Sequence, residues 1–390
     1  MFVTPLFKLM ADKQASDMFF TAGAPIQIKI DGVVMPVNSQ VLEAEQVKRI
    51  CYELMNEAQV KEFESGHEMN FAQSGGAEMG NFRVNIFRQR NTVAMVIRFV
   101  KPEVPAFESL GLPPILKEVI MEKLGLILVV GSTGSGKSTT MASMIDFRNT
   151  QRTGHILSIE DPIEFSFRHK KSIVNQREVR VDTHSYQNAL ISAMREAPDL
   201  LMIGEIRDQP TLQSALLFAQ TGHLCLSTLH ANNSYHALNR IINFFPREAR
   251  EALLADLAIS LRCIMSQRLI RNKEGARIPA VEVLLNTPHI SELIKNGAMG
   301  EIKDAMEQSL APGSQTFEQA LFNLYSTGQI TLENALANSD SPTNLHWLIN
   351  NTGKTATEPA PSQEDLKSGT RNSSTQGDDL SSIKLNLDMV

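Results

Sequence analysis

A glycine-rich turn at residues 131–138 carries the residue types that bind phosphate. It reads GSTGSGKS, fits the pattern G-x-x-x-x-G-K-[S/T], and directly follows the apolar run LILVV. The glycines let backbone N–H groups converge on phosphate oxygens at a helix N-terminus. Lys137 offers a positive charge to the outer phosphates, and Ser138 supplies a ligand for Mg²⁺. We therefore predict that nucleotide is bound by Ser132, Thr133, Gly134, Ser135, Gly136, Lys137, Ser138 and Thr139.

Two acidic segments follow short apolar runs in the same part of the chain. Residues 200–203 precede Gly204 and Glu205, and residues 156–159 precede the three acids of Glu160–Glu164. Because an open α/β sheet binds its ligands at the carboxyl ends of its strands, these acids are expected beside the phosphates. An acid at Glu205 could hold the water shell of Mg²⁺ or polarise the attacking water. One such acid is usually a solvated loop residue, but two sets at equivalent strand ends favour catalysis.

Two histidines flank the predicted strand Leu224–Leu229. Seven residues at ~3.3 Å each separate His223 from His230 by roughly 23 Å, so both cannot touch one phosphate. His230, at the carboxyl end, is expected to contact the γ-phosphate. His223, at the opposite end, is expected to serve a subunit contact or a helix cap. A hydrogen-bonded structural histidine is the alternative for each.

Four segments together resemble the motifs of the secretion ATPase family. GSTGSGKST, IEDPIEF, APDLLMIGEIRD and TGHLCLSTLH occur in the order and at the spacings of its Walker A, Asp box, Walker B and His box. The resemblance covers about residues 1–345. It implies an ATP-hydrolysing hexameric ring with ATP bound between two domains, and it maps Glu164 and Glu205 onto the catalytic carboxylates.

The same resemblance implies that arginines from the N-terminal domain reach the phosphates. The segment Phe82–Arg88 and its predicted hairpin partner Val93–Phe99 offer Arg83 and Arg98. An arginine of this kind contributes ~10³ to 10⁵ in rate, so closure of the domain on ATP would gate hydrolysis. A solvated strand arginine is the alternative.

Within the family, the chain resembles the retraction branch. It shows neither the additional N-terminal domain nor the four-cysteine zinc insertion that extension and secretion ATPases commonly carry. This implies type IV pilus retraction and twitching motility, with the paralogue PilT and an inner-membrane platform protein as partners and a cytoplasmic location at the inner membrane. Residues 288–295 keep the apolar positions of the branch's late AIRNLIRE-type helix but lose its arginines. An ATP-dependent adaptor of PilT, or an extension or secretion ATPase, therefore remain alternatives.

The elements that must position these residues predict an α/β chain of two domains. Residues 126–228 repeat the order strand, turn, helix, which indicates a parallel sheet, and the family implies a RecA-like ATPase domain there. Helices are expected at Gln187–Ala197 and Thr211–Thr221. The complete division is a small α+β domain at 1–100 that the family implies is PAS-like, a linker at 101–112, the ATPase domain with C-terminal helices at 113–346, and a disordered tail at 347–390.

The tail and the composition bear on the partners. The last eight residues alternate apolar and polar side chains, as a peptide that docks on a sheet edge would.

A net charge of −6 disfavours nucleic-acid binding and so disfavours a RecA-like nucleic-acid motor. The three cysteines are widely spaced and predict neither a disulfide framework nor a zinc site. No apolar run near the P-loop approaches the ~20 residues of a membrane span, and no secretion signal is recognised.

Overall fold

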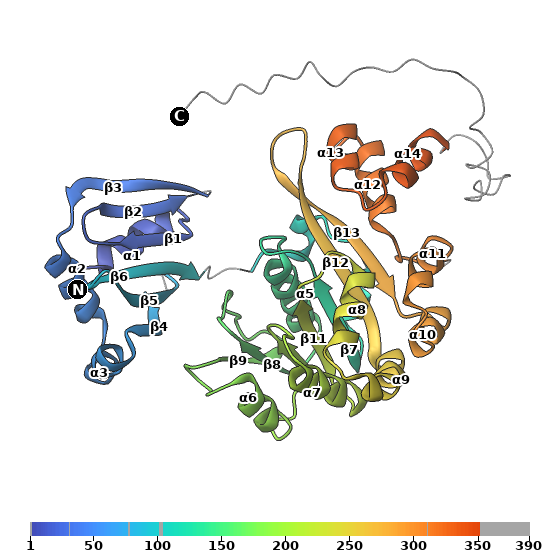
Figure 1. Cartoon of the computed structure of the whole chain (residues 1–390), viewed down its shortest axis with the longest axis horizontal. Coiled ribbons are helices and arrows are strands. Elements are labelled where there is room, and N and C mark those ends of the chain that lie inside the picture. The colour runs from blue at the N-terminus through green and yellow to red at the C-terminus, as the bar shows by residue number, and fades with distance from the viewer. Residues whose placement is uncertain (1, 31, 77–78, 101–103, 310, 352–390) are drawn as a thin grey trace, which may run out of the picture. The chain divides into compact units, whose positions relative to one another are not determined.

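The computed structural model describes residues 2–30, 32–76, 79–100, 104–309 and 311–351, and its elements are labelled in Figure 1. The predicted disordered tail and its alternating last segment lie almost entirely outside these residues. Helix α14 (Pro342–Asn351) runs past position 347, where the predicted tail begins. In the described part of the chain, no helix is long and apolar enough to span a membrane.

The N-terminal part of the chain forms an antiparallel sheet with the strand order β3-β2-β1-β6-β5-β4. Helices and strands follow one another as α1 (Thr4–Asp12), β1 (Asp17–Phe20), β2 (Pro25–Ile30), β3 (Val33–Val41), α2 (Ala44–Leu54), α3 (Glu57–Gly66), β4 (Glu68–Ser74), β5 (Asn81–Gln89) and β6 (Thr92–Val100). A separate core of aromatic and aliphatic side chains, including Phe7, Phe63 and Phe82, fills this part. The mixture of strands and helices agrees with the predicted α+β domain, and its PAS-like character stays a prediction.

Strands β5 and β6 form the hairpin that the sequence predicts. Arg90 and Asn91 both have positive φ in the two-residue turn, which matches the right-handed twist of the strands. The register places Arg83 directly opposite Arg98 and Arg98 opposite Asp17 of β1. Both candidate arginines therefore point to the same face of this sheet.

The second sheet has seven strands in the order β13-β12-β7-β11-β10-β8-β9. Its strands are β7 (Gly125–Val130), β8 (Gly154–Glu160), β9 (Ser172–Glu178), β10 (Leu200–Ile203), β11 (Leu224–Leu229), β12 (Leu261–Arg271) and β13 (Arg277–Leu285). The predicted parallel arrangement is confirmed, because β7, β11, β10 and β8 pair in parallel. Their carboxyl ends consequently meet at one edge of the sheet.

Helices cover both faces of this sheet (Figure 1). Strand β7 is buried along its whole length. Leu126, Leu128 and Val130 pack in one core with α6 (Tyr186–Ala193), α7 (Gln209–Gln220), α8 (Ser234–Asn243) and α9 (Arg250–Ser260). The intervening Ile127 and Val129 pack in the other core with α4 (Ile115–Ile120) and α5 (Lys137–Gln151). Successive strand residues point to opposite faces, so β7, which is covered on both faces, is apolar at every position.

Of the two helices predicted from the sequence, α7 has the expected start and end, whereas α6 is shorter than predicted. Helix α7 begins with Asp208 as N-cap and Pro210 in its first turn, and Gly222 has φ 102° just after its end, as expected. Helix α6 ends at Ala193, so its predicted extension to Ala197 is wrong. The chain turns there instead, and Ala197 adopts a left-handed φ of 47°.

The sequence predicts C-terminal helices in the ATPase domain, but residues 236–346 also contain the β12–β13 hairpin. Two polar residues, Ser266 and Gln267, interrupt the apolar pattern of β12. Both are buried and both have hydrogen-bond partners inside the protein. The helical expectation holds for the remaining elements, α8–α9, α10 (Pro288–Lys295), α11 (Ile302–Glu307), α12 (Phe317–Ser326), α13 (Leu332–Ala337) and α14.

An arginine buried in the core joins the P-loop helix α5 to the segment that follows the predicted linker. Arg148 is 2% exposed, and its Nη1 donates to the carbonyl oxygens of Ile120 (2.6 Å) and Glu122 (2.8 Å). Arg152 donates to the carbonyl of Met121 (3.0 Å). These carbonyls lie at the C-terminal end of α4, where a helix leaves its carbonyls without internal partners. The arginines satisfy them and fix α4 to α5.

Candidate active site

The turn between β7 and α5 requires glycine at two positions for steric reasons. A Cβ at Gly131 would lie 2.6 Å from the carbonyl oxygen of Gln267, and one at Gly136 would lie 2.7 Å from Nε2 of the same residue. Both glycines also have positive φ, 154° and 88°. The Gln267 side chain donates to the carbonyl of Ser135 (2.8 Å) and accepts from Thr140 (2.8 Å). Strand β12 thus braces the turn, a role that the sequence analysis missed because Gln267 belongs to no motif.

Lys137 is held over this turn. Its ammonium group donates to the carbonyl oxygens of Gly131 (2.9 Å) and Ser132 (2.8 Å). Burial lowers the pKa of Lys137, and the negative charges of Glu205 and Glu164 oppose that shift. The two carboxylates selected from the sequence are therefore electrostatic neighbours of the P-loop lysine.

One cavity of about 240 Å³ brings most of the predicted site residues together. Strand ends β8, β10 and β11 meet the start of α5 there. The predicted residues that line it are Thr133, Gly134, Lys137, Ser138, Glu164, Glu205 and His230. Ser132 and Ser135 line a second cavity over the turn, and Gly136 and Thr139 line a third on the far side of the turn. The nucleotide-binding residues predicted from the sequence thus lie around a single turn.

Glu205 has an arginine and a histidine as neighbours in this cavity. Arg207 Nε donates to its Oε2 (2.6 Å), and His230 Nε2 lies 3.3 Å from its Oε1. The bond to Glu205 raises the pKa of Arg207. Thr228 donates to the carbonyl of Gly204 (2.6 Å) and fixes the backbone before the acid. Arg207 was not selected as a site residue, although it stands inside the Walker B-like segment.

Tyr186 is a second residue that the sequence analysis missed. It lines the same cavity from the first turn of α6, and a Cβ at Gly204 would lie 2.8 Å from its hydroxyl. Burial raises the pKa of this phenol, so it stays a neutral hydrogen-bond donor at physiological pH. The glycine before Glu205 is needed for this close approach, rather than for flexibility alone.

Glu160 is a buried carboxylate at the end of β8. Its Oε1 accepts from Ser158 (2.6 Å) and from Gln176 (3.2 Å), and its carboxylate also accepts from the backbone N–H of Glu164. Burial raises its pKa to about 7, because these hydrogen bonds only partly offset the loss of water. Gln176 additionally donates to the carbonyl of Phe165 (2.8 Å). Glu160 and Gln176 together hold the segment that carries Glu164.

The raised pKa of Glu160 predicts a pH-dependent stability. Between pH 5.5 and 8 the unfolded chain has released this proton, while the folded protein still binds it up to about pH 7. Folding stability from this group therefore falls as pH rises. From pH 5.5 to pH 8 we expect the free energy of unfolding of Glu160→Gln, relative to that of the unsubstituted protein, to rise by on the order of 1–2 kcal/mol. Urea unfolding midpoints at both pH values measure the change.

Glu248→Gln, on an exposed turn, is the matched control and is expected to show no such difference. If the difference in unfolding free energy between Glu160→Gln and the unsubstituted protein were the same at both pH values, the raised pKa of Glu160 would be contradicted.

The structure treats the two candidate arginines differently. Arg83 Nη2 lies 3.6 Å from Glu178 and 3.8 Å from Asp161, a lining residue of the carboxylate cavity. Arg98 instead pairs with Asp17 (3.0 Å) inside its own sheet, with its side chain 63% exposed. Arg83 is thus within ion-pair distance of the acidic segment, whereas Arg98 is not brought to the site.

His223 lies at the opposite end of β11 from His230. Its Nδ1 is 3.2 Å from the carbonyl oxygen of Phe218 and 3.3 Å from the hydroxyl of Thr221, at the C-terminal end of α7. A histidine at a helix C-terminus satisfies a carbonyl that lacks an internal partner. This placement favours the helix-cap interpretation over a phosphate contact.

The predicted Mg²⁺ ligands offer the oxygen donors that this cation prefers. Ser138 and Glu205 line the same cavity, and a hydroxyl and a carboxylate suit direct and water-mediated contacts. Across the described residues, no three His, Cys, Asp or Glu side chains gather as a metal-binding group. The residues fit a Mg²⁺ ion that arrives with nucleotide, because such ions keep several waters and use substrate phosphates as ligands.

Comparison with known proteins gives consistent matches along most of the chain. The family model described as "Type II/IV secretion system protein" matches residues 1–335. Among curated relatives, the type IV pilus ATPase PilU of Pseudomonas aeruginosa is 48% identical over 88% of this chain and 90% of its own length. The type IV pilus retraction ATPase PilT of the same organism is 39% identical over 88% of this chain and 99% of its own length.

A solved structure agrees with these sequence matches. The crystal structure of the pilus retraction motor PilT with bound ADP aligns with a TM-score of 0.82 and 40% identity, covering 88% of this chain and 99% of that one. The resemblance to the secretion ATPase family, inferred from four short motifs, and to its retraction branch is therefore confirmed over most of the chain.

Proposed function

The chain belongs to the type II/IV secretion system protein family, and from this premise we propose that it is an ATP-hydrolysing motor that powers type IV pilus retraction. The observation that carries the proposal is the meeting of Lys137, Glu164 and Glu205 around one cavity. The similarity to PilU and to the ADP-bound PilT structure supports both the nucleotide and the pilus.

The proposed reaction transfers the γ-phosphoryl group of ATP to water. Lys137 and the backbone N–H groups of the turn neutralise charge on the outer phosphates. Ser138, and Glu205 through water, would hold a Mg²⁺ ion that would supply further positive charge there. Glu164 helps to orient the attacking water, and Glu205 accepts its proton. His230, at 3.3 Å from Glu205, is placed to exchange that contact for one to the γ-phosphate, and so to register its loss.

The proposed working form is a homo-hexamer at the cytoplasmic side of the inner membrane, acting with PilT on a membrane platform protein. Closure of the N-terminal domain on ATP and its release after hydrolysis would supply the stroke, with Arg83 as the N-terminal-domain arginine within ion-pair distance of Asp161 in the acidic segment. The exposed apolar side chains of edge strand β3 support contacts of the N-terminal domain with another protein, because Val33, Val34 and Val41 are more than half exposed.

Deletion of the coding sequence in the native host tests the direction of the motor. A retraction motor removes pilins, so the deletion strain is expected to accumulate surface pili and to lose surface motility. Electron microscopy of pili and a surface-spreading assay measure the two outcomes. Bald cells would contradict retraction and indicate an extension ATPase.

An adaptor that depends on PilT is the second candidate function. The observation that favours it is α10, whose sequence PHISELIK lacks the arginines found at this place in the retraction branch. Measuring ATP turnover by the purified chain, alone and mixed with PilT, separates the two functions. A motor hydrolyses ATP alone, whereas an adaptor changes only the turnover of the mixture.

A further inference from the structure

The loop that carries His230 connects the end of β11 to the start of α8. It spans residues 230–233, and His230 at its start lines the cavity that also contains Glu164 and Glu205. Three successive residues, Asn232–Ser234, are each hydrogen-bonded to an arginine or an acid from another part of the chain. The position of the loop therefore depends on side chains that do not line the catalytic cavity.

Arg268 of β12 holds the first of these three residues. Its Nη2 donates to the carbonyl of Asn232 (3.2 Å), and its Nη1 donates to the carbonyl of Asn338 (2.5 Å), the C-cap of α13. Its guanidinium carbon lies 3.9 Å from the centre of the ring of Phe317, the first residue of α12. An arginine fork that has two carbonyl partners and stacks on an aromatic ring keeps one orientation, so it fixes Asn232.

Asp340 holds the second residue. Its Oδ1 pairs with Arg268, and its Oδ2 accepts from the side-chain amide of Asn233 (2.9 Å). The side chains of Arg268 and Asp340 are only 22% and 27% exposed, so water screens their pair incompletely. Asn233 is also the N-cap of α8, where its side-chain oxygen accepts from the backbone N–H of His236. Asp340 thus fixes the residue that starts α8, three positions after His230.

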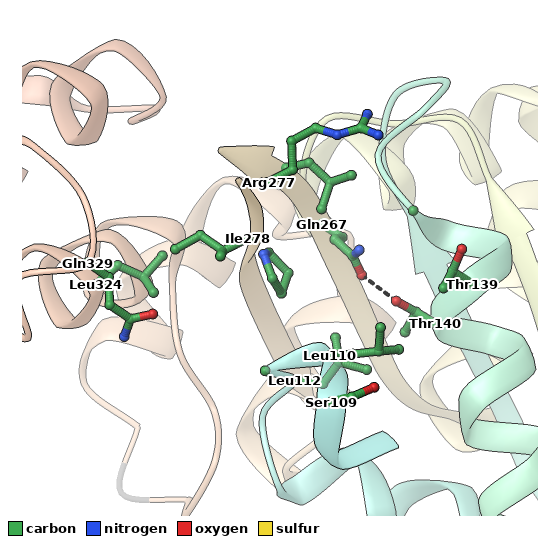
Figure 2. A pocket seen from close by; sticks show the side chains of 14 residues that line it. Ser109, Leu110, Leu112, Thr139, Thr140, Gln267, Arg277, Ile278, Leu324 and Gln329 are labelled. Carbon is green, nitrogen blue, oxygen red and sulfur yellow. Dashed lines mark hydrogen bonds between the residues drawn. The ribbon is translucent and has the colours of Figure 1, made fainter. Parts of the chain in front are cut away.

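The third residue is held by the β12–β13 hairpin. The backbone N–H of Ser234 donates to buried Glu282 of β13 (2.7 Å), which also accepts from Ser266 of β12 (3.1 Å). The same hairpin contacts the P-loop, because Gln267 accepts from Thr140 of α5 (Figure 2). Neighbouring residues of β12 therefore contact both the P-loop and the loop after β11.

The segment that carries Asp340 is attached to the C-terminal helices. It spans residues 338–341, between α13 and α14. Buried Glu318 of α12 accepts from the backbone N–H of Ser341 (2.8 Å) and lies 3.3 Å from Lys303 of α11. A displacement of α11, α12 or α13 would consequently act on Asp340.

We propose that Arg268 and Asp340 are positioning residues for recognition of the γ-phosphate. They hold the loop so that His230 faces the catalytic cavity, and they make this arrangement depend on the C-terminal helices. The inference rests on the proposed function, because the contact of His230 with the γ-phosphate is itself part of it. A shift of these helices that separates Asp340 from Arg268 would release Asn232 and Asn233, and would lower the preference of the site for ATP over ADP.

Binding of ADP and of the non-hydrolysable ATP analogue AMP-PNP to the full chain tests the proposal by calorimetry. ADP lacks the γ-phosphate, so the ratio of the two dissociation constants reports on recognition of that group. Asp340→Ala is expected to lower the preference for AMP-PNP roughly 2–30-fold, the range in which residues without contact to a ligand modulate its binding, and to leave ADP binding unchanged. Arg268→Lys keeps the charge but loses the planar fork, and is expected to act in the same direction.

A double-mutant cycle with His230→Ala distinguishes positioning of this histidine from general support of the fold. Asp340→Ala is expected to have little further effect once His230 is removed, because both changes act on one contact. Thermal unfolding measures stability separately, and Asp340→Asn, which keeps the size of the side chain, serves if the alanine variant does not fold. Glu333→Ala, an exposed acid on α13, is the matched control.

An unchanged preference for AMP-PNP in the Asp340 and Arg268 variants would overturn the inference. Equal weakening of ADP and AMP-PNP, or the same loss of preference with and without His230, would overturn it as well. If His230→Ala alone left the preference unchanged, the inference would fail together with the proposed role of His230. Failure of the proposed function as a whole would look different, since the unsubstituted chain would then not hydrolyse ATP.

Discussion

Glu205→Gln is expected to lower ATP turnover by about 10²–10⁴-fold while ATP still binds, because a general base contributes that factor to a proton transfer. The amide keeps the size of the side chain but loses the charge that faces Lys137 and accepts from Arg207. Phosphate release at saturating ATP measures the turnover, and a fluorescent nucleotide measures binding.

The matched control is Glu292→Gln, an exposed acid on α10 that lines none of the cavities around the turn. It is expected to leave turnover unchanged. Normal turnover by Glu205→Gln would show that the carboxylate at the end of β10 is not the catalytic group.

Lys137→Ala is expected to weaken ATP binding by roughly 10–100-fold, since a hydrogen bond to a charged group contributes about 1.5–3 kcal/mol. The substitution also removes the two bonds from the ammonium group to the carbonyls of Gly131 and Ser132. The turn therefore loses a brace as well as a charge. Titration with a fluorescent nucleotide measures the dissociation constant.

Lys123→Ala, an exposed lysine before β7, controls for the loss of one positive charge from the surface. If Lys137→Ala bound ATP as tightly as Lys123→Ala does, the assignment of the phosphate site to residues 131–138 would be refuted.

The parallel core of the fold was predictable because its signals are local. Strands β7, β8, β10 and β11 are short apolar runs, and the residues that follow their ends are the ones that line the candidate active site. Parallel pairing then brings Lys137, Glu164, Glu205 and His230 together without any knowledge of side-chain contacts.

The supporting residues were not predictable, because their roles depend on contacts between distant segments. Gln267 donates to the carbonyl of Ser135 in the P-loop, 132 positions earlier in the chain. Because Gln267 is polar, the apolar pattern of a buried strand is interrupted in β12, and the strand was not predicted. Tyr186 acts through its packing against Gly204, which no pattern near either residue indicates. The order of the N-terminal sheet likewise follows from pairings such as Asp17 with Arg98.

The buried arginine of α5 has a mechanical consequence. In the proposed function helix α5 binds phosphate at one end, and at the other end Arg148 and Arg152 attach it to the end of α4. Any tension on the chain that enters through residues 104–114 is therefore delivered to the far end of the phosphate-binding helix. A pull on the connector and the loss of a phosphate would therefore act on opposite ends of α5.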